Sequence, residues 1–144
     1  MATETTVTDI LIRTAIADDL EPLTSFLVPF VEAGKLLPRT FDELRELLPT
    51  LFVAEQDGKI VGCAALEIYS WKLAEVRSLA VSPAMQGQGV GKRLVEACLD
   101  RARTANILEV MAITSSDGFF MSCGFDYTLP GEKRALFMQL RNLQ

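Results

Sequence analysis

The chain has 144 residues, of which 49% are hydrophobic and 23% are charged, the balance of one soluble globular domain. Its 19 acidic residues outnumber its 14 basic residues, and the net charge of −5 argues against a general nucleic-acid-binding surface. The sequence contains no histidine, which excludes Ser-His-Asp and Cys-His catalysis and removes the commonest metal ligand.

The cysteines Cys63, Cys98 and Cys123 are odd in number and lack CxxC spacing, so we expect neither a disulfide framework nor a zinc site. Reduced thiols suit the cytoplasm. The polar, acidic start is not that of a signal peptide, and no apolar run approaches the roughly 20 residues that span a bilayer. We therefore expect a cytoplasmic protein, residues 1–144 forming one domain with a disordered tail at 1–8, and no metal, nucleic-acid or membrane partner.

The first half of the chain predicts strands and helices in a clear order. The elements are a strand at 10–15, a helix that begins at Asp18-Asp19, a helix that begins at Thr40 or Asp42 and stops near Pro49, and strands at 51–55 and 60–68 joined by an Asp57-Gly58 turn.

The second half predicts one crossover and two final strands. The elements are a strand at 74–81, a Gly-rich loop at 85–92, an amphipathic helix from 91 to about 104, a strand at 107–113, a short helix at 117–122 that ends at Gly124, and strands at 125–127 and 135–140. This order predicts an α/β (α+β) fold with a mostly antiparallel sheet and one strand–loop–helix–strand crossover.

The Gly-rich loop is the segment most informative about chemistry. In Gln86-Gly87-Gln88-Gly89-Val90-Gly91-Lys92, three glycines let backbone N–H groups converge on one point, and a helix N-terminus follows. Together they predict an anion site suited to a pyrophosphate. It is not a Walker loop, because Lys92 is followed by Arg93, and the GxGxG spacing is not that of a Rossmann loop.

Three motifs carry a resemblance to a known family. The loop fits [Arg/Gln]-x-x-Gly-x-[Gly/Ala], the strand end Arg77–Pro83 precedes it, and Phe119–Phe125 is similar to an "FYxxxGF" signature. In this order they resemble the GCN5-related N-acetyltransferases (GNAT) over nearly the whole chain. The resemblance implies the GNAT fold, with helices on both faces of the sheet and with the strand before the loop splayed from the strand that follows the next helix.

The same resemblance implies acetyl-CoA as cofactor and a set of residues that hold it. The cofactor would bind against Leu79, Ala80, Val81, Gln86, Gly87, Gln88, Gly89, Val90, Gly91, Lys92 and Phe120.

Four further segments resemble the acetyltransferase domain of N-acetylglutamate synthases. They are 34–40 ("G-x-L-x-x-R-[ST]"), 62–66 ("GCAAL"), 72–76 (near "KIGEM") and 129–137 ("LPxxKRxLY"). Larger members carry an amino-acid-kinase domain in front, so we expect a stand-alone transferase domain here. The resemblance implies acetylation of the α-amine of L-glutamate, in arginine biosynthesis, and a homodimer is common in the family.

Acetyl transfer needs a neutral amine, and Glu75 is the expected base, acting directly or through one water in a direct attack without an acyl-enzyme. The substrate carboxylates would be clamped by Lys35, Arg39, Arg77 and Arg134. Phe120 stands where the family commonly has a Tyr that acts as general acid. Water, Ser115, Ser116 or Cys123 would therefore protonate the leaving thiolate.

Two other functions stay open from the sequence. Val28 stands where the synthases often have a substrate-binding Arg, so the acceptor could be another amine: a polyamine, an aminoglycoside or a protein N-terminus. A cationic acceptor would use an acidic pocket formed from Glu32, Glu43, Glu46 and Glu67. The other possibility is a non-catalytic acyl-CoA-binding module.

Overall fold

The computed structural model describes residues 9–127 and 134–140, so the predicted tail at 1–8 and the motif residues 129–133 lie outside the described residues. The helices and strands in chain order are β1 (Leu11–Thr14), α1 (Leu20–Glu32), α2 (Phe41–Leu47), β2 (Leu51–Gln56), β3 (Lys59–Ser70), β4 (Leu73–Val81), α3 (Val90–Thr104), β5 (Glu109–Met111) and α4 (Asp117–Ser122). Short 3₁₀ turns at Ala17–Asp19, Leu48–Thr50 and Pro83–Met85 join some of them.

The strands form one sheet in the order β1-β2-β3-β4-β5. Neighbours from β1 to β4 are antiparallel, and β5 pairs parallel to β4 after the crossover through α3. The β2–β3 turn has positive φ at both Asp57 (52°) and Gly58 (77°), as a type I′ hairpin requires. The mixed α/β sheet and its single crossover confirm the predicted fold class.

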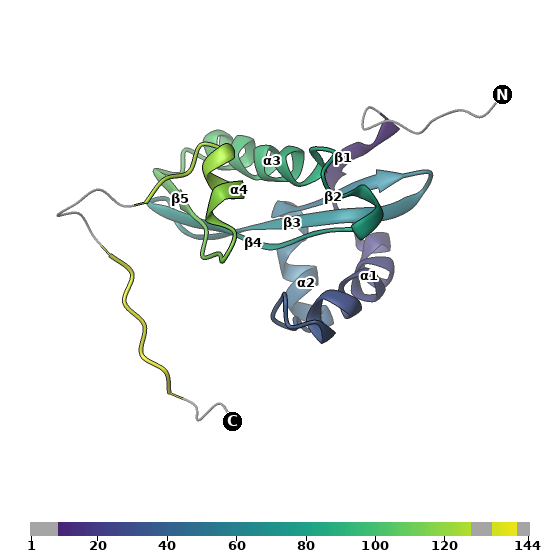
Figure 1. Cartoon of the computed structure of the whole chain (residues 1–144), viewed down its shortest axis with the longest axis horizontal. Helices are drawn as coiled ribbons and strands as arrows, with labels where there is room; N and C mark the ends of the chain where they lie inside the picture. Colours follow the sequence, from purple (N-terminus) through teal and green to yellow (C-terminus); the bar gives the residue numbers. More distant parts are fainter. Residues whose placement is uncertain (1–8, 128–133, 141–144) are drawn as a thin grey trace.

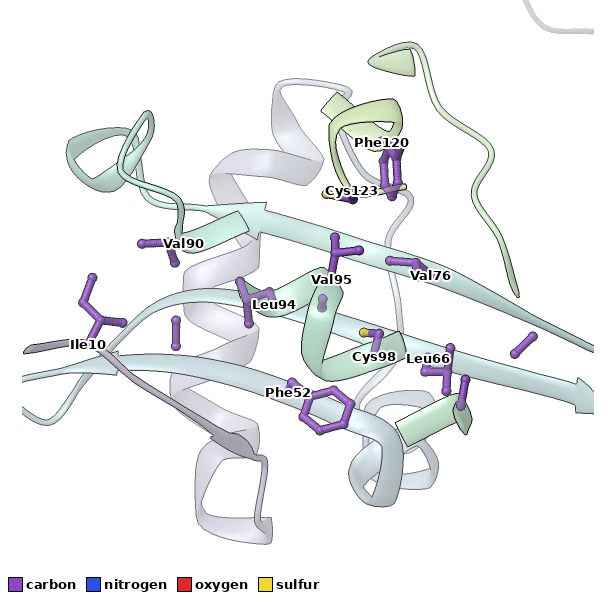
Figure 2. Packing of buried hydrophobic residues seen from close by; sticks show 14 of the residues in the cluster. Ile10, Phe52, Leu66, Val76, Val90, Leu94, Val95, Cys98, Phe120 and Cys123 are labelled. Carbon is purple, nitrogen blue, oxygen red and sulfur yellow. The ribbon is translucent and has the colours of Figure 1, made fainter. Parts of the chain in front are cut away.

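Helices cover both faces of the sheet, with α3 and α4 on one side and α1 and α2 on the other (Figure 1). Because side chains alternate along a strand, each strand contributes to both cores. On β2, Phe52 and Ala54 join the α3 core, whereas Leu51 and Val53 join the α1–α2 core. Leu94, Val95 and Cys98 of α3 lie over the sheet in the first core, among other buried residues (Figure 2).

Two local contacts explain where the first helices begin. Arg13 on β1 makes a bidentate contact with the Asp19 carboxylate, at 2.7 and 2.8 Å, and Asp19 also accepts the Ile16 N–H at 2.7 Å. Thr40 caps α2: its hydroxyl accepts the Glu43 N–H at 3.1 Å, and Glu43 accepts the Thr40 N–H at 2.8 Å. The predicted helix starts at Asp18-Asp19 and Thr40 are therefore confirmed.

Three predicted strands differ from the structure. The strand expected at 107–113 covers only Glu109–Met111, because β5 pairs with β4 over those three residues alone. The strands expected at 125–127 and 135–140 are wrong, since neither range is a strand. Phe125 instead packs on Phe120 beside α4, with ring centroids 5.2 Å apart, and the apolar side chains of 136–138 and 140 are exposed.

Candidate active site

Strand β4 leaves its neighbour β5 partway along its length. The parallel register runs from Leu73↔Glu109 to Glu75↔Met111, whereas β4 continues to Val81. Beyond Glu75, the side of β4 that faces β5 has no strand partner among the residues that the structure describes. Leu79, Ala80 and Val81, three of the predicted cofactor residues, lie on this stretch, where backbone N–H and C=O groups can bind an extended ligand.

A β-bulge at Ser78 bends the same stretch of β4. Ala65 pairs with Arg77 and Cys63 with Ala80, so β4 has one residue more than β3 in this interval, and Ser78 has a φ of +55°. The bulge brings Arg77 and Ser78 toward the same side, where Arg39 from the loop before α2 donates to the Ser78 hydroxyl at 2.9 Å. Bulges often re-aim side chains beside active sites in this way.

The loop between β4 and α3 presents its backbone to solvent. Gly87 (φ +80°) and Gly89 (φ +82°) are left-handed, and residues 86–89 are exposed. The side-chain amides of Gln86 and Gln88 donate back to the Val81 and Ala84 carbonyls, which braces the loop. Gly89 is the N-cap of α3 and has no side chain to occupy the first amides of the helix.

The start of α3 suits an anionic group on these observations. The first amides of this 15-residue helix carry the positive end of the helix dipole, and Lys92 is exposed beside them. A Cβ on Gly91 would approach the Phe119 ring at 3.3 Å, so glycine lets the first turn of α3 pack against α4. A hollow of about 520 Å³ between β1 and α3 includes Gly89 and Lys92 in its lining.

The candidate base Glu75 lies buried on β4 with 7% of its surface exposed. It faces Glu67 across the β3–β4 pair, and its Oε1 accepts the Tyr69 hydroxyl at 2.6 Å. Glu67 is bound by two arginines at the same oxygen: Oε2 accepts from Arg77 Nη1 at 3.0 Å and from Arg39 Nη2 at 3.4 Å. Two carboxylates and two guanidinium groups thus meet on the α1–α2 side of the sheet.

The ionisable groups of this cluster influence one another. Burial alone would lower the pKa of Arg77, but its hydrogen bond with Glu67 and the nearby carboxylates outweigh burial and raise it. Partial burial, followed by the hydrogen bond to Glu75, raises the pKa of Tyr69 to about 12. Both side chains therefore stay protonated at neutral pH and act as donors.

The structure brings some of the predicted residues together and leaves others apart. Glu75, Arg77 and Arg39 meet in one cluster, whereas Lys35 and Arg134 are exposed and no described contact links them to it. Phe120 is buried in the α3 core between Phe119 and Phe125, so its contact with the cofactor stays a prediction (Figure 2). Burial also raises the pKa of the Cys123 thiol, one of the proposed substitutes for the missing Tyr.

Tyr69 and Ser78 are the members of this cluster that motif reasoning missed. Tyr69 lies outside the matched motifs, and Ser78 lies in the Arg77–Pro83 strand end but has no predicted role there. Each enters the cluster at a β-bulge. The sequence does indicate that Glu67 lies near Glu75, since a tight turn at Trp71-Lys72 places residues 67 and 75 opposite each other.

Within the described residues, no group of His, Cys, Asp and Glu could hold a metal ion, and no helix is long and apolar enough to cross a membrane.

The sequence matches one known protein family over most of its length. Residues 15–125 match the sequence profile of the acetyltransferase (GNAT) family. The chain belongs to this family. This GNAT protein is an N-acetyltransferase, and acetyl-CoA is its cofactor.

Two sequence relatives are similar to this chain over about four fifths of its length. An uncharacterised N-acetyltransferase of Chlorobaculum tepidum is 32% identical over 117 residues, which make up 81% of this chain and 76% of that protein. An amino-acid acetyltransferase of Mycobacterium tuberculosis is 34% identical over 119 residues, which make up 80% of this chain and 67% of that protein.

Two similar crystal structures contain coenzyme A. A Mycobacterium tuberculosis protein in complex with CoA and NLQ superposes with a TM-score of 0.75 and 33% identity, over 83% of this chain and 73% of that chain. N-acetylglutamate synthase of Neisseria gonorrhoeae, complexed with coenzyme A and N-acetyl-glutamate, gives a TM-score of 0.71 and 31% identity over 84% of this chain. The match spans only 28% of the length of the gonococcal enzyme.

Proposed function

We propose that this protein acetylates the α-amine of a small amino acid, L-glutamate, with Glu75 as the base. The observation that carries the proposal is the position of Glu75: it is buried where β4 parts from β5, and Arg39 and Arg77 bind Glu67, its cross-strand neighbour. The names of the relatives and the N-acetyl-glutamate in one structural neighbour support an amino-acid acceptor.

The end of the site formed by β4 and the start of α3 would bind acetyl-CoA. Bound acetyl-CoA supplies the acetyl group as a thioester. The backbone of 79–81 would hold the extended arm of the cofactor, and the amides of 86–92 would hold its pyrophosphate. Phe120 would support the cofactor from α4.

The acceptor side would use the charged cluster. The guanidinium groups of Arg77 and Arg39 would bind the substrate carboxylates, and the more exposed Lys35 and Arg134 would add positive charge at the entrance. Glu75 would remove a proton from the substrate ammonium, directly or through one water, so that the neutral amine can attack the thioester carbonyl. The C–S bond would then break, and the CoA thiolate that leaves would take a proton from water. We further propose that the protein works in the cytoplasm, in arginine biosynthesis, as a homodimer.

A thiol-release assay with acetyl-CoA tests this function against L-glutamate, L-glutamine, L-aspartate, L-lysine, spermidine and an aminoglycoside. We expect turnover with glutamate that falls at least a hundredfold in Glu75→Gln, because general bases contribute roughly 10²–10⁴-fold. Arg77→Ala should raise the KM for glutamate. Arg103→Ala is the matched control, because that side chain is 66% exposed and pairs with Asp100 in the last turns of α3.

The alternative outcomes are equally informative. Turnover only with a cationic amine would overturn glutamate as the acceptor and keep the cofactor assignment. Turnover that survives Glu75→Gln would overturn the role of the base.

A further inference from the structure

Tyr69 occupies a second β-bulge, next to the candidate base. Ile68 pairs with Ala74 and Ser70 pairs with Leu73, so β3 has one residue more than β4 at Tyr69. Tyr69 is 50% exposed, yet its hydroxyl donates to Glu75 Oε1 at 2.6 Å. The bulges at Tyr69 on β3 and Ser78 on β4 flank Glu75 and turn polar side chains toward the same cluster.

The Tyr69–Glu75 hydrogen bond lies where two carboxylates face each other across the β3–β4 pair. Glu67 and Glu75 are direct cross-strand neighbours, and like charges in that position destabilise a sheet. The two arginines contact Glu67, whereas Glu75 receives the Tyr69 hydroxyl. Glu75 is the more buried of the two carboxylates, so it has the greater need of a donor.

We propose that Tyr69 is a positioning residue for Glu75: its hydroxyl holds Oε1 and leaves Oε2 to take the proton from the acceptor amine. The inference rests on the proposed function, because it needs Glu75 to be the base. The phenol suits the task, since it stays protonated at neutral pH and remains a donor.

Other charged groups act on the same carboxylate. Glu67 lies on β3, Arg77 on β4 and Arg39 in the loop before α2, and Glu43 of α2 lies near enough to both arginines to interact with them. Met111 is the residue that β5 places opposite Glu75. Among these groups, Tyr69 is the one that the structure shows bonded to Glu75 and that can be removed without changing a charge.

The test compares Tyr69→Phe with the unaltered protein by two readouts. One is the acid limb of the pH profile of kcat/KM, and the other is the pH midpoint of the Glu75 carboxyl signal in ¹³C NMR of the substrate-free protein. Phenylalanine cannot donate to the Glu75 carboxylate, so we expect both midpoints to rise in the variant. We also expect kcat/KM at neutral pH to fall roughly tenfold in protein that is still fully folded at the assay temperature.

Two variants complete the design. Tyr127→Phe is the matched control, because the other of the two tyrosines donates to the Asp117 carboxylate beside α4, so its loss should move neither midpoint. Glu67→Gln removes the facing like charge and should move both midpoints in the opposite direction. That opposite shift would show that the NMR signal reports on Glu75 and its neighbours.

The outcomes separate this inference from the proposed function. If Glu75→Gln abolishes turnover but Tyr69→Phe leaves both midpoints in place, Tyr69 does not position the base and the inference is overturned. The same holds if Tyr69→Phe lowers activity only in step with its thermal stability. If Glu75→Gln keeps full activity, the proposed function fails, whatever the NMR titration of Tyr69→Phe shows.

Discussion

The contact between Arg13 and Asp19 joins β1 to the start of α1, and Asp19→Asn should weaken the whole fold. Asp19 accepts three hydrogen bonds, two from Arg13 at 2.7 and 2.8 Å and one from the Ile16 N–H at 2.7 Å. Its side chain is 10% exposed and that of Arg13 is 27% exposed, so water screens the pair only in part. Bonds to a charged group contribute about 1.5–3 kcal/mol each before such screening.

Asparagine would keep one acceptor oxygen and lose the charge, so we expect a net loss of about 2 kcal/mol. For a domain of this size the melting temperature should fall by roughly 6 °C, measured by circular dichroism at pH 7. Asp18→Asn is the matched control, because Asp18 is its exposed neighbour. Equal melting temperatures for the two variants would refute the reasoning.

The pH dependence of this effect has a definite sign. The hydrogen bond from Arg13, joined by the Ile16 N–H and opposed by burial, lowers the pKa of Asp19 in the folded state. A lowered folded-state pKa stabilises fully above the unfolded value of about 3.9, and the contribution is lost as pH falls through the folded-state pKa. The gap in stability between Asp19→Asn and the unaltered protein should be constant from about pH 5 to 8 and close in stronger acid.

Three further variants or treatments test the packing and the helix ends. Gly62→Ala would place a Cβ 3.0 Å from Leu94 Cδ1 and 3.2 Å from the Ala80 carbonyl oxygen, so urea unfolding should show a loss of about 1–3 kcal/mol. Gly118→Ala, which has open space around the added Cβ, should be nearly neutral in the same assay. Thr40→Ala should cost about 1 kcal/mol through loss of the α2 cap, and Thr40→Ser should restore most of it. Burial raises the pKa of Cys63 and Cys98 to about 12, so a thiol reagent at pH 8 should label them only after unfolding; rapid labelling of either in the folded protein would contradict this.

The elements that were predicted correctly have local causes. The Asp57-Gly58 turn, the Thr40 cap and the Gly87 and Gly89 conformations each depend on residues within a few positions of one another. The strands predicted at 125–127 and 135–140 are wrong because strand formation depends on a pairing partner that is distant in sequence. An apolar run has strand propensity anywhere, but a strand exists only beside a partner, and β5 pairs with β4 over just three residues.

The candidate site likewise contains residues that local sequence predicts and residues that depend on distant contacts. Glu75 and Arg77 could be found because they lie in a recognisable strand end, close to the Gly-rich loop. The contact of Arg39 with Ser78 joins residues 39 positions apart, and it depends on a bulge that adds one residue to the register. A bulge has no side-chain signature of its own at Ser78 or Tyr69, so the sequence alone could not place Tyr69 against the base.

The charge balance of the site bears on which acceptor the proposal favours. A polyamine or aminoglycoside would need an acidic surplus, and the pocket predicted for it relied on Glu67 and Glu43 among other residues. Glu67 is already bound by Arg39 and Arg77, and Glu43 is used in the cap of α2. An acidic amino acid matches this cluster: its carboxylates can replace Glu67 at the two arginines, and its ammonium can contact Glu75. Two arginines opposed by two glutamates therefore fit a zwitterionic acceptor better than a polycation, which is the physical reason to test L-glutamate first.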